Sequence, residues 1–294
     1  MPQSIDELVA ILDLETLEVD LYRGRQPDTA FQRVFGGQVA GQALVAATRT
    51  ADSKFRAHSL HAYFLWPGDT SVPIVYDVER IRDGRSFQTR RVAARQHGRA
   101  IFYLSASFHR PEPGFDHQDA MPDVPDPEQC PAMSEVYAHA SGRPGEEFER
   151  EWAALDLRYV GDSWPSAGRL AEPGHPALAR VWLRAAGRLP DDPVLHSCVL
   201  AYASDLTLLG VSLVPHDSYI GDPRVMPASL DHALWFHRPF RADDWLLYDQ
   251  VSPSASGARG FAIGRVFARS GALVASVAQE GLIRPVGRRA PDGE

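Results

Sequence analysis

Lysine and cysteine are scarce in this chain of 294 residues. Lys54 is its only lysine, and Cys130 and Cys198 are its only cysteines. The spacing of these two cysteines favours neither a disulfide framework nor a zinc site. We therefore expect no metal, and a reducing cytoplasm as the location.

Several catalytic and binding signatures are missing as well. The sequence has no Gly-x-Ser-x-Gly elbow, no His-Glu-x-x-His motif and no glycine-rich loop for a phosphate or a dinucleotide. These absences remove the support for a serine hydrolase, a zinc hydrolase and a nucleotide-binding protein. We therefore expect no cofactor.

Excess positive charge is also lacking, because 30 basic and 38 acidic side chains give a net charge of −8. This balance argues against non-specific binding to nucleic acid or to an anionic membrane. The N-terminus lacks the pattern of a signal peptide, and we judge that no apolar run approaches membrane-spanning length. We expect neither nucleic acid nor a membrane as a partner.

One segment is rich in arginine and contains a single acid, Asp83. These arginines either attract phosphate groups or line the exposed face of two amphipathic strands, and both interpretations stay open. The set comprises Arg80, Arg82, Arg85, Arg90, Arg91, Arg95, Arg99 and Arg110.

An internal repeat organises the chain. Residues 36–50 show the apolar spacing of a helix, and strand-like runs follow at 58–66, 72–81, 87–96 and 100–109. The same order returns with a helix at 193–210 and strand-like runs at 229–237, 245–252, 261–269 and 272–279. The pattern predicts two tandem α+β units, each with a long central helix wrapped by a curved antiparallel sheet.

The region between the repeats is different in composition. It is rich in proline and acidic residues and has no sustained apolar period, which is typical of a linker that packs over the surface. We predict an N-terminal unit at 1–112, this linker at 113–150, a C-terminal unit at 151–286 and a tail at 287–294.

The two units differ at polar positions. Aligning the repeats places Ala106 of the first unit at the position of Gln279 in the second. With His61 aligned over His232, Ser229 stands opposite His58. A glutamine can hold a water or polarise a carbonyl without adding charge. It can also be a hydrogen-bonded amide at a strand end, so periodicity alone leaves its role open.

Several motifs resemble the type II acyl-CoA thioesterases, which have a double hotdog fold. They are RVFGGQVAGQAL, HSLHAYFLWPGD, ASDLTLLG, SLDHALWFHRPF, SASGARGFAIGRVF and LVASVAQEG, and the resemblance covers roughly residues 5–285. It implies hydrolysis of fatty acyl-CoA to a free fatty acid and CoA, without a covalent intermediate. One departure is Trp66, where arginine is usual in the family.

The resemblance also implies the catalytic residues. The family's aspartate on the second long helix falls on Asp205, its hydroxyl residue on Ser229 and its glutamine on Gln279. These three groups would hold and activate a water. Taken alone, each residue type also has a structural role, such as a paired helix aspartate, a turn serine or a strand-end amide.

Other groups are candidates for substrate contact. Gly37 and Gln38 open the first helix, where free N–H groups can face a carbonyl or a phosphate, although close backbone packing is an alternative there. Arg259 is a candidate for the nucleotide end of acyl-CoA. The acyl chain is expected in a tunnel beside the second helix.

Two other functions stay open. A hotdog hydratase or dehydratase would need a histidine beside the aspartate, and along the sequence only His196 lies near Asp205. A non-catalytic acyl-CoA-binding protein would not need the set of Asp205, Ser229 and Gln279. By analogy with the family we also expect a homo-oligomer, a dimer or a tetramer.

Overall fold

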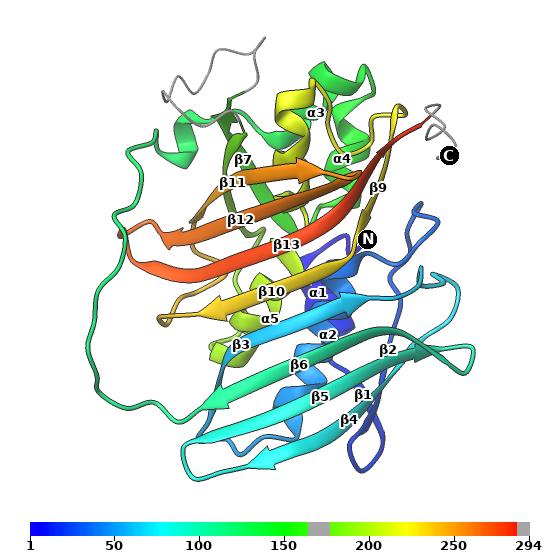
Figure 1. Cartoon of the computed structure of the whole chain (residues 1–294), viewed down its shortest axis with the longest axis vertical. Coiled ribbons are helices and arrows are strands. Elements are labelled where there is room, and N and C mark those ends of the chain that lie inside the picture. Colours follow the sequence, from blue (N-terminus) through cyan, green and yellow to red (C-terminus); the bar gives the residue numbers. More distant parts are fainter. Residues whose placement is uncertain (164–176, 287–294) are drawn as a thin grey trace, which may run out of the picture.

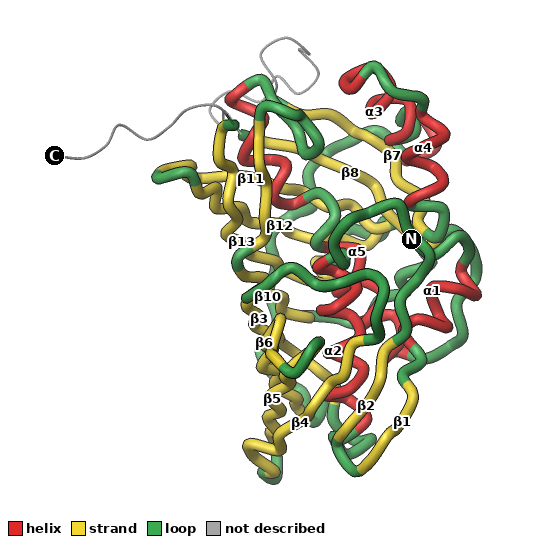
Figure 2. Tube along the Cα trace, turned by 90° about the vertical axis from the view of Figure 1, so that its right-hand side faces the viewer, coloured by secondary structure: helices red, strands yellow, loops and turns green. Residues whose placement is uncertain are grey.

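A computed structural model describes residues 1–163 and 177–286, and the predicted tail at 287–294 lies outside them. One large curved sheet forms one layer of the molecule, and helices cover its inner face (Figure 1, Figure 2). The first repeat contains α1 (Ile5–Leu12), β1 (Glu15–Glu18), β2 (Leu21–Gly24), α2 (Gly36–Arg49), β3 (Arg56–Phe64), β4 (Ile74–Asp83), β5 (Phe87–Gln96) and β6 (Arg99–His109).

The second repeat has the same order of elements. It contains β7 (Leu155–Asp162), β8 (Leu178–Ala185), α5 (Pro193–Ser204), the 3-10 helix η2 (Leu208–His216), β9 (Val225–Ser229), β10 (Asp231–Phe236), β11 (Leu246–Ser256), β12 (Arg259–Ala268) and β13 (Leu273–Pro285). Between the repeats lie η1 (Pro127–Gln129), α3 (Met133–Ser141) and α4 (Gly145–Glu151).

The two repeats share one sheet. Its strand order is β1-β2-β4-β5-β6-β3-β10-β13-β12-β11-β8-β7, in which the second half mirrors the first. The halves join where β3 pairs with β10 in antiparallel register, and β9 adds to β13 outside this order. This junction removes one exposed edge from each unit.

The central helices α2 and α5 lie against each other behind the sheet (Figure 2). Every α2 residue from Gly37 to Ala47 is buried. Glycines allow the two backbones to come close, because a Cβ atom added at Gly37 would lie 2.1 Å from the carbonyl oxygen of Tyr202. At Gly41 the corresponding distance to the Cys198 carbonyl oxygen is 3.1 Å.

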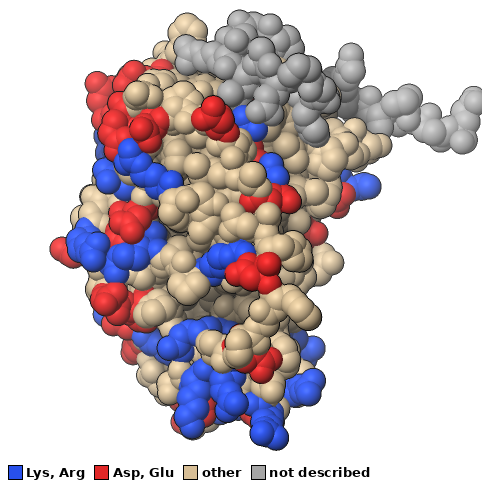
Figure 3. Space-filling view, turned by 90° about the vertical axis from the view of Figure 1, so that its left-hand side faces the viewer, with Lys and Arg blue, Asp and Glu red and all other residues tan. Residues whose placement is uncertain are grey.

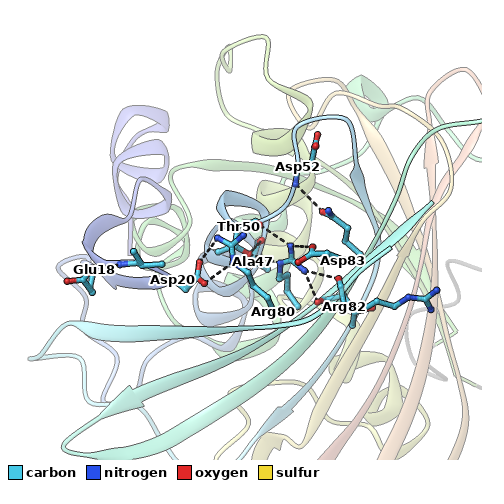
Figure 4. Close-up of polar contacts among 12 residues, drawn as sticks. Glu18, Asp20, Ala47, Thr50, Asp52, Arg80, Arg82 and Asp83 are labelled. Atoms are coloured by element: carbon cyan, nitrogen blue, oxygen red, sulfur yellow. Dashed lines mark hydrogen bonds and ion pairs between the residues drawn. The ribbon is translucent and has the colours of Figure 1, made fainter. Parts of the chain in front are cut away.

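A buried arginine lies at the other end of α2. Arg90 is 1% exposed, and its guanidinium donates hydrogen bonds to the carbonyl and hydroxyl oxygens of Thr50, the C-cap of that helix. It also pairs with Asp83 at 2.5 Å, and Figure 4 labels both Thr50 and Asp83. A cation at this position compensates the negative end of the helix dipole.

The other arginines of this segment are mostly engaged on the surface. Arg80 pairs with Asp20 (Figure 4), Arg91 with Glu79 and Arg95 with Asp77, while Arg99 lies over the Trp66 ring. These pairs favour the strand-face interpretation over a dedicated phosphate site, and Arg90 does not belong to the exposed face at all. Basic side chains still gather at the end of the N-terminal unit, the lower end in Figure 3.

The structure corrects several element boundaries. The predicted helix at 193–210 ends as an α-helix at Ser204, and Asp205 is its C-cap before the chain tightens into η2. The predicted linker contains α3 and α4, which are too short to show a sustained apolar period. The short strands β1, β2, β7, β8 and β9 and the helix α1 were not predicted.

The structure also corrects the expectation that no apolar run approaches membrane-spanning length. The helical segment Pro193–His216 is long and apolar enough to cross a membrane, and it is the one such helix among the described residues. However, 78% of its apolar window is buried inside the protein. The segment is the core helix of the C-terminal unit, so its apolar composition follows from packing on all sides.

Replacing Gly37 by alanine should destabilise the protein by about 1–3 kcal/mol, because the added methyl group meets the Tyr202 carbonyl of α5. Urea unfolding monitored by circular dichroism measures this change. Gly114→Ala is the control, since no atom lies within 4 Å of a Cβ added there. Equal unfolding midpoints for the two variants would contradict the proposed close contact of α2 and α5.

Candidate active site

Asp205 lies where the two central helices meet. It follows α5, which begins with Asp192 as N-cap and Pro193 in its first turn, and it precedes η2. Its carboxylate faces the N-terminus of α2, where a Cβ added at Gly36 would lie 2.5 Å from Oδ2. The backbone N–H of Gly37 donates a hydrogen bond to this carboxylate. The positive end of α2 therefore partly compensates a buried negative charge.

The structure brings Ser229 and Gln279 to the same carboxylate. The Gln279 Nε2 donates to Asp205 Oδ1 at 2.5 Å, and the Ser229 hydroxyl lies 3.3 Å from the same oxygen. The Gln279 Nε2 also lies 3.1 Å from Ser229 Oγ, which accepts from it. The three residues predicted from sequence thus form one hydrogen-bonded cluster.

Strand pairing explains how residues so distant in sequence meet. Ser229 ends β9 and pairs with Gly281 of β13, two residues beyond Gln279 on the same strand. Gln279 stands opposite Ala262 of β12 and is fully buried on the inner face of the sheet. The extra pairing of β9 with β13 therefore places the hydroxyl beside the amide.

The environment of Asp205 suits a general base. Burial raises its pKa from the ordinary value of 3.8 to about 6, and the hydrogen bonds from Gln279, Ser229 and Gly37 partly oppose this shift. A carboxylate with a pKa close to neutrality accepts a proton more readily than an exposed aspartate and is still ionised at neutral pH. The Oε1 atom of Gln279 is buried and has no hydrogen-bond partner within residues 1–163 and 177–286, so it can accept a hydrogen bond from a water.

A cavity of about 1660 Å³ opens beside this cluster. Asp205 and Ser229 belong to its wall, which also includes apolar side chains of α2, β3 and η2. The linker helices α3 and α4 contribute a further part of the wall, including Met133, Val136, Tyr137, Phe148 and Trp152. A largely apolar cavity that ends at a buried carboxylate can hold an acyl chain with its polar end at Asp205.

The three candidate substrate-binding residues lie in different places. The Gly37 N–H meets the carboxylate of Asp205. Gln38 is buried and donates to Arg25 O and Gln26 Oε1, away from the cavity wall. Arg259 is half exposed and pairs with Glu280 at 2.8 Å, and it does not line the cavity either. The placements of Gln38 and Arg259 give no support to a substrate contact.

Sequence reasoning missed His232. It is fully buried on β10, and its Nδ1 atom lies 3.9 Å from Asp205 Oδ1. His196 is the histidine near Asp205 along the sequence, but in space His232 approaches the carboxylate, whereas the Nδ1 atom of His196 accepts from the Ala242 N–H. The alignment of His232 with His61 hid this arrangement, since His61 is exposed on the outer face beside the Trp235 ring.

A second missed pair lies in the cavity wall. The Thr207 hydroxyl donates to Gln250 Oε1 at 3.0 Å, and Gln250 Nε2 is buried without a partner. Both residues come from segments that were read only as helix or strand. As for metals, residues 1–163 and 177–286 contain no group of His, Cys, Asp and Glu side chains placed to hold an ion.

Two helix-and-sheet units in one continuous sheet, with a buried carboxylate at an apolar cavity, define a double hotdog protein. A solved structure from Alicyclobacillus acidocaldarius, described as having a hot dog fold, agrees in fold with a TM-score of 0.75 at 19% identity. It covers 94% of this chain and 97% of that protein.

Closer relatives identify the family. The family model for acyl-CoA thioesterase matches residues 164–282, and the model for the acyl-CoA thioesterase N-terminal domain matches residues 25–109. Mouse acyl-coenzyme A thioesterase 8 is 42% identical, over 94% of this chain and 88% of its own. The structure of an acyl-CoA thioesterase II from Mycobacterium marinum is 48% identical, with a TM-score of 0.81 and coverage of 97% and 99%. The chain belongs to the acyl-CoA thioesterase family.

The pKa of Asp205 has a consequence for stability. Between pH 3.8 and about 6 the folded protein keeps a proton on Asp205 that the unfolded chain has released, so this group lowers stability as the pH rises. Asp205→Asn removes that cost. The variant should be more stable than the wild type at pH 7.5, by up to about 3 kcal/mol.

The gain should shrink below pH 6 and vanish below the unfolded value, which urea unfolding at several pH values measures. Asp222→Asn is a control of opposite sign, because the hydrogen bond from Arg224 holds the pKa of Asp222 well below its usual range. That variant should lose stability at pH 7.5. An Asp205→Asn variant without any pH-dependent gain would show that the carboxylate is not strained by burial.

Proposed function

We propose that this protein hydrolyses fatty acyl-CoA to a free fatty acid and CoA through a water activated directly by Asp205. The observation that carries the proposal is the hydrogen-bonded cluster of Asp205, Ser229 and Gln279, of which Asp205 and Ser229 line a largely apolar cavity. Membership of the acyl-CoA thioesterase family supports the substrate class. The reaction assigns the protein to lipid metabolism.

The reaction requires few groups from the protein. Asp205 accepts a proton from the water while the oxygen of that water attacks the thioester carbonyl carbon. The tetrahedral oxyanion then collapses, the C–S bond breaks, and the thiolate of CoA leaves and takes up the proton. An ordinary thiol has a pKa of about 8.5, so the thiolate departs without a strong general acid.

Ser229 and Gln279 orient the base and the water. The Ser229 hydroxyl and the Gln279 amide both donate toward Asp205 Oδ1, and the Gly37 N–H donates to the same carboxylate. The remaining lone pairs of the carboxylate accept the proton of the water. The unpartnered Oε1 of Gln279 accepts the second hydrogen of that water. The cluster thus fixes the nucleophile before the substrate carbonyl arrives.

The acyl chain occupies the cavity, and the nucleotide end of CoA stays at the surface. At the rim, Trp66 replaces the arginine that is usual in the family, and the Arg99 guanidinium lies 4.8 Å from the centre of its ring. The stacked pair therefore still presents a positive charge at this position. That charge suits the phosphates of CoA.

The alternatives receive less support. A hydratase or dehydratase needs a histidine that acts on the substrate together with the aspartate, but His232, the histidine near Asp205, is fully buried and its Nε2 atom is hydrogen-bonded to Ser204 Oγ. A protein that only binds acyl-CoA would not require three polar groups arranged around a costly buried carboxylate. Hydrolysis uses every group of the cluster.

Free-thiol release from acyl-CoAs of several chain lengths tests the proposal. The wild type should release thiol, with a kcat/KM that rises with pH through about 6 as Asp205 ionises. Asp205→Asn and Gln279→Ala should each lose roughly 100-fold or more, because they remove the base and one holder of the water. Gln38→Ala is the control and should retain activity. An inactive wild type would refute hydrolysis, and active folded variants would refute the site.

We further propose a cytoplasmic homo-oligomer, a dimer or a tetramer. Its support is the outer face of the sheet, which exposes Tyr63, Tyr103, Phe261 and Ile263 near the junction of the two units. Light scattering should give a multiple of 32.4 kDa. Tyr63→Arg combined with Tyr103→Arg should shift the mass toward the monomer, whereas a monomeric wild type would contradict the proposal.

A further inference from the structure

His232 is a buried histidine that the proposed reaction does not use. Its ring is fully buried, and its Nε2 atom lies 2.9 Å from Ser204 Oγ. The Ser204 hydroxyl donates to the carbonyl oxygen of Ala201, one turn earlier in α5. With the one hydroxyl proton directed to Ala201, we assign the proton of the neutral His232 ring to Nε2, which donates to Ser204 Oγ, and the lone pair to Nδ1.

This lone pair faces the candidate base. Among the residues that the structure describes, His232 Nδ1 has no hydrogen-bond partner, and it lies 3.9 Å from Asp205 Oδ1. Burial lowers the pKa of His232 to about 4, so the ring is neutral at working pH. A neutral acceptor beside a carboxylate disfavours the ionised form and favours the protonated form, which can donate a hydrogen bond.

The repeat supplies a comparison within the same molecule. In the first unit Leu60 of β3 pairs with Ala106 of β6. In the second unit Ala233 pairs with Ala278, so the next position in this register sets His232 opposite Gln279. With Ala106 aligned to Gln279, as in the sequence repeat, Leu60 aligns with His232. Only the unit that carries the carboxylate cluster has a histidine there.

The other groups around Asp205 do not share this property. Gly37 of α2, Ser229 of β9 and Gln279 of β13 all donate to the carboxylate and so favour its ionised form. Tyr248 of β11 is the other titratable neighbour, and its hydroxyl donates to the Ser204 carbonyl. Among the described residues, no charged side chain contributes to the pKa shift of Asp205. Among the described residues, two unpartnered acceptor atoms lie near this carboxylate: Gln279 Oε1, which is assigned to the water, and His232 Nδ1, which faces Oδ1.

We propose that His232 is a positioning residue that favours proton acceptance by Asp205 in the hydrolysis step. The inference rests on the proposed function, because it concerns the base of that reaction. When Asp205 takes the proton from the water, its negative charge is neutralised, and the repulsion between Oδ1 and the lone pair of His232 Nδ1 is relieved. The proton stays on Asp205 until the thiolate leaves.

The test is the pH dependence of kcat/KM for thiol release by the full chain. His232→Leu, which copies the residue of the first unit, should move the acidic limb to lower pH by about half a unit or more and lower the plateau several-fold. His232→Asn keeps an acceptor near the position of Nδ1, so the acidic limb of its kcat/KM profile should return to the wild-type pH. A folded His232→Leu variant with an unmoved limb would overturn the proposal.

His196→Leu provides the matched control. His196 is also buried and has one unpartnered ring nitrogen, but it lies nine residues before Asp205, about 13 Å along α5. This variant should lose stability, because it removes the acceptor of the Ala242 N–H, and should leave the acidic limb in place. An equal shift of the limb in both leucine variants would attribute the effect to general loosening and reject a specific role for His232.

A measurement without turnover separates this inference from the proposed function. Urea unfolding at pH 7.5 of the wild type, Asp205→Asn, His232→Leu and the double variant forms a double-mutant cycle. Replacing His232 should cost more stability in the Asp205→Asn background than in the wild type, because the new amide can donate to Nδ1 and the carboxylate cannot. Additive effects would overturn the proposal, even in a protein that hydrolyses acyl-CoA. A non-additive cycle in an inactive protein would instead count only against hydrolysis.

Discussion

The close backbone contact between α2 and α5 is the constraint on which the site depends. Glycines at 37 and 41 let the two helices approach until a single methyl group would collide with a carbonyl of the partner. This approach sets the positive end of α2 against Asp205, at the point where α5 ends. At its other end, α2 meets the buried guanidinium of Arg90. One helix thus carries opposite charges at its two ends, each placed to suit the dipole.

The sheet accounts for the asymmetry of the site. Its two halves repeat the same strand order, but the cluster of Asp205, Ser229 and Gln279 forms in the second half, where β9 adds to β13 and brings Ser229 beside Gln279. In the sequence alignment of the repeats, Ala106 of the first half takes the place of Gln279. The first half instead buries Arg90, which binds Thr50 and Asp83. Two similar scaffolds therefore hold buried groups of opposite charge.

Sequence alone predicted the repeat, the helices and most central strands because their apolar periods are long and clear. Gln279 was singled out by comparison of the two repeats, and Asp205 and Ser229 by family resemblance. His232 escaped because an alignment shifted by a single residue exchanges the faces of a strand, so a buried residue was matched with the exposed His61. The end of α5 at Asp205 also escaped, since η2 continues the same apolar composition in a tighter helix. The cavity depends on tertiary packing of α3 and α4, which short-range patterns do not reveal.

Because α3 and α4 lie outside the two repeats, the residues that shape the cavity are partly separate from the residues that carry out hydrolysis. They lie between the two repeats and form no part of the sheet, yet their side chains make up one wall of the cavity. Substitutions at residues 133–152 can therefore reshape the space for the acyl chain and leave the cluster around Asp205 intact. Evolution can retune the substrate range of such a protein within a single connecting segment, at little risk to the duplicated scaffold.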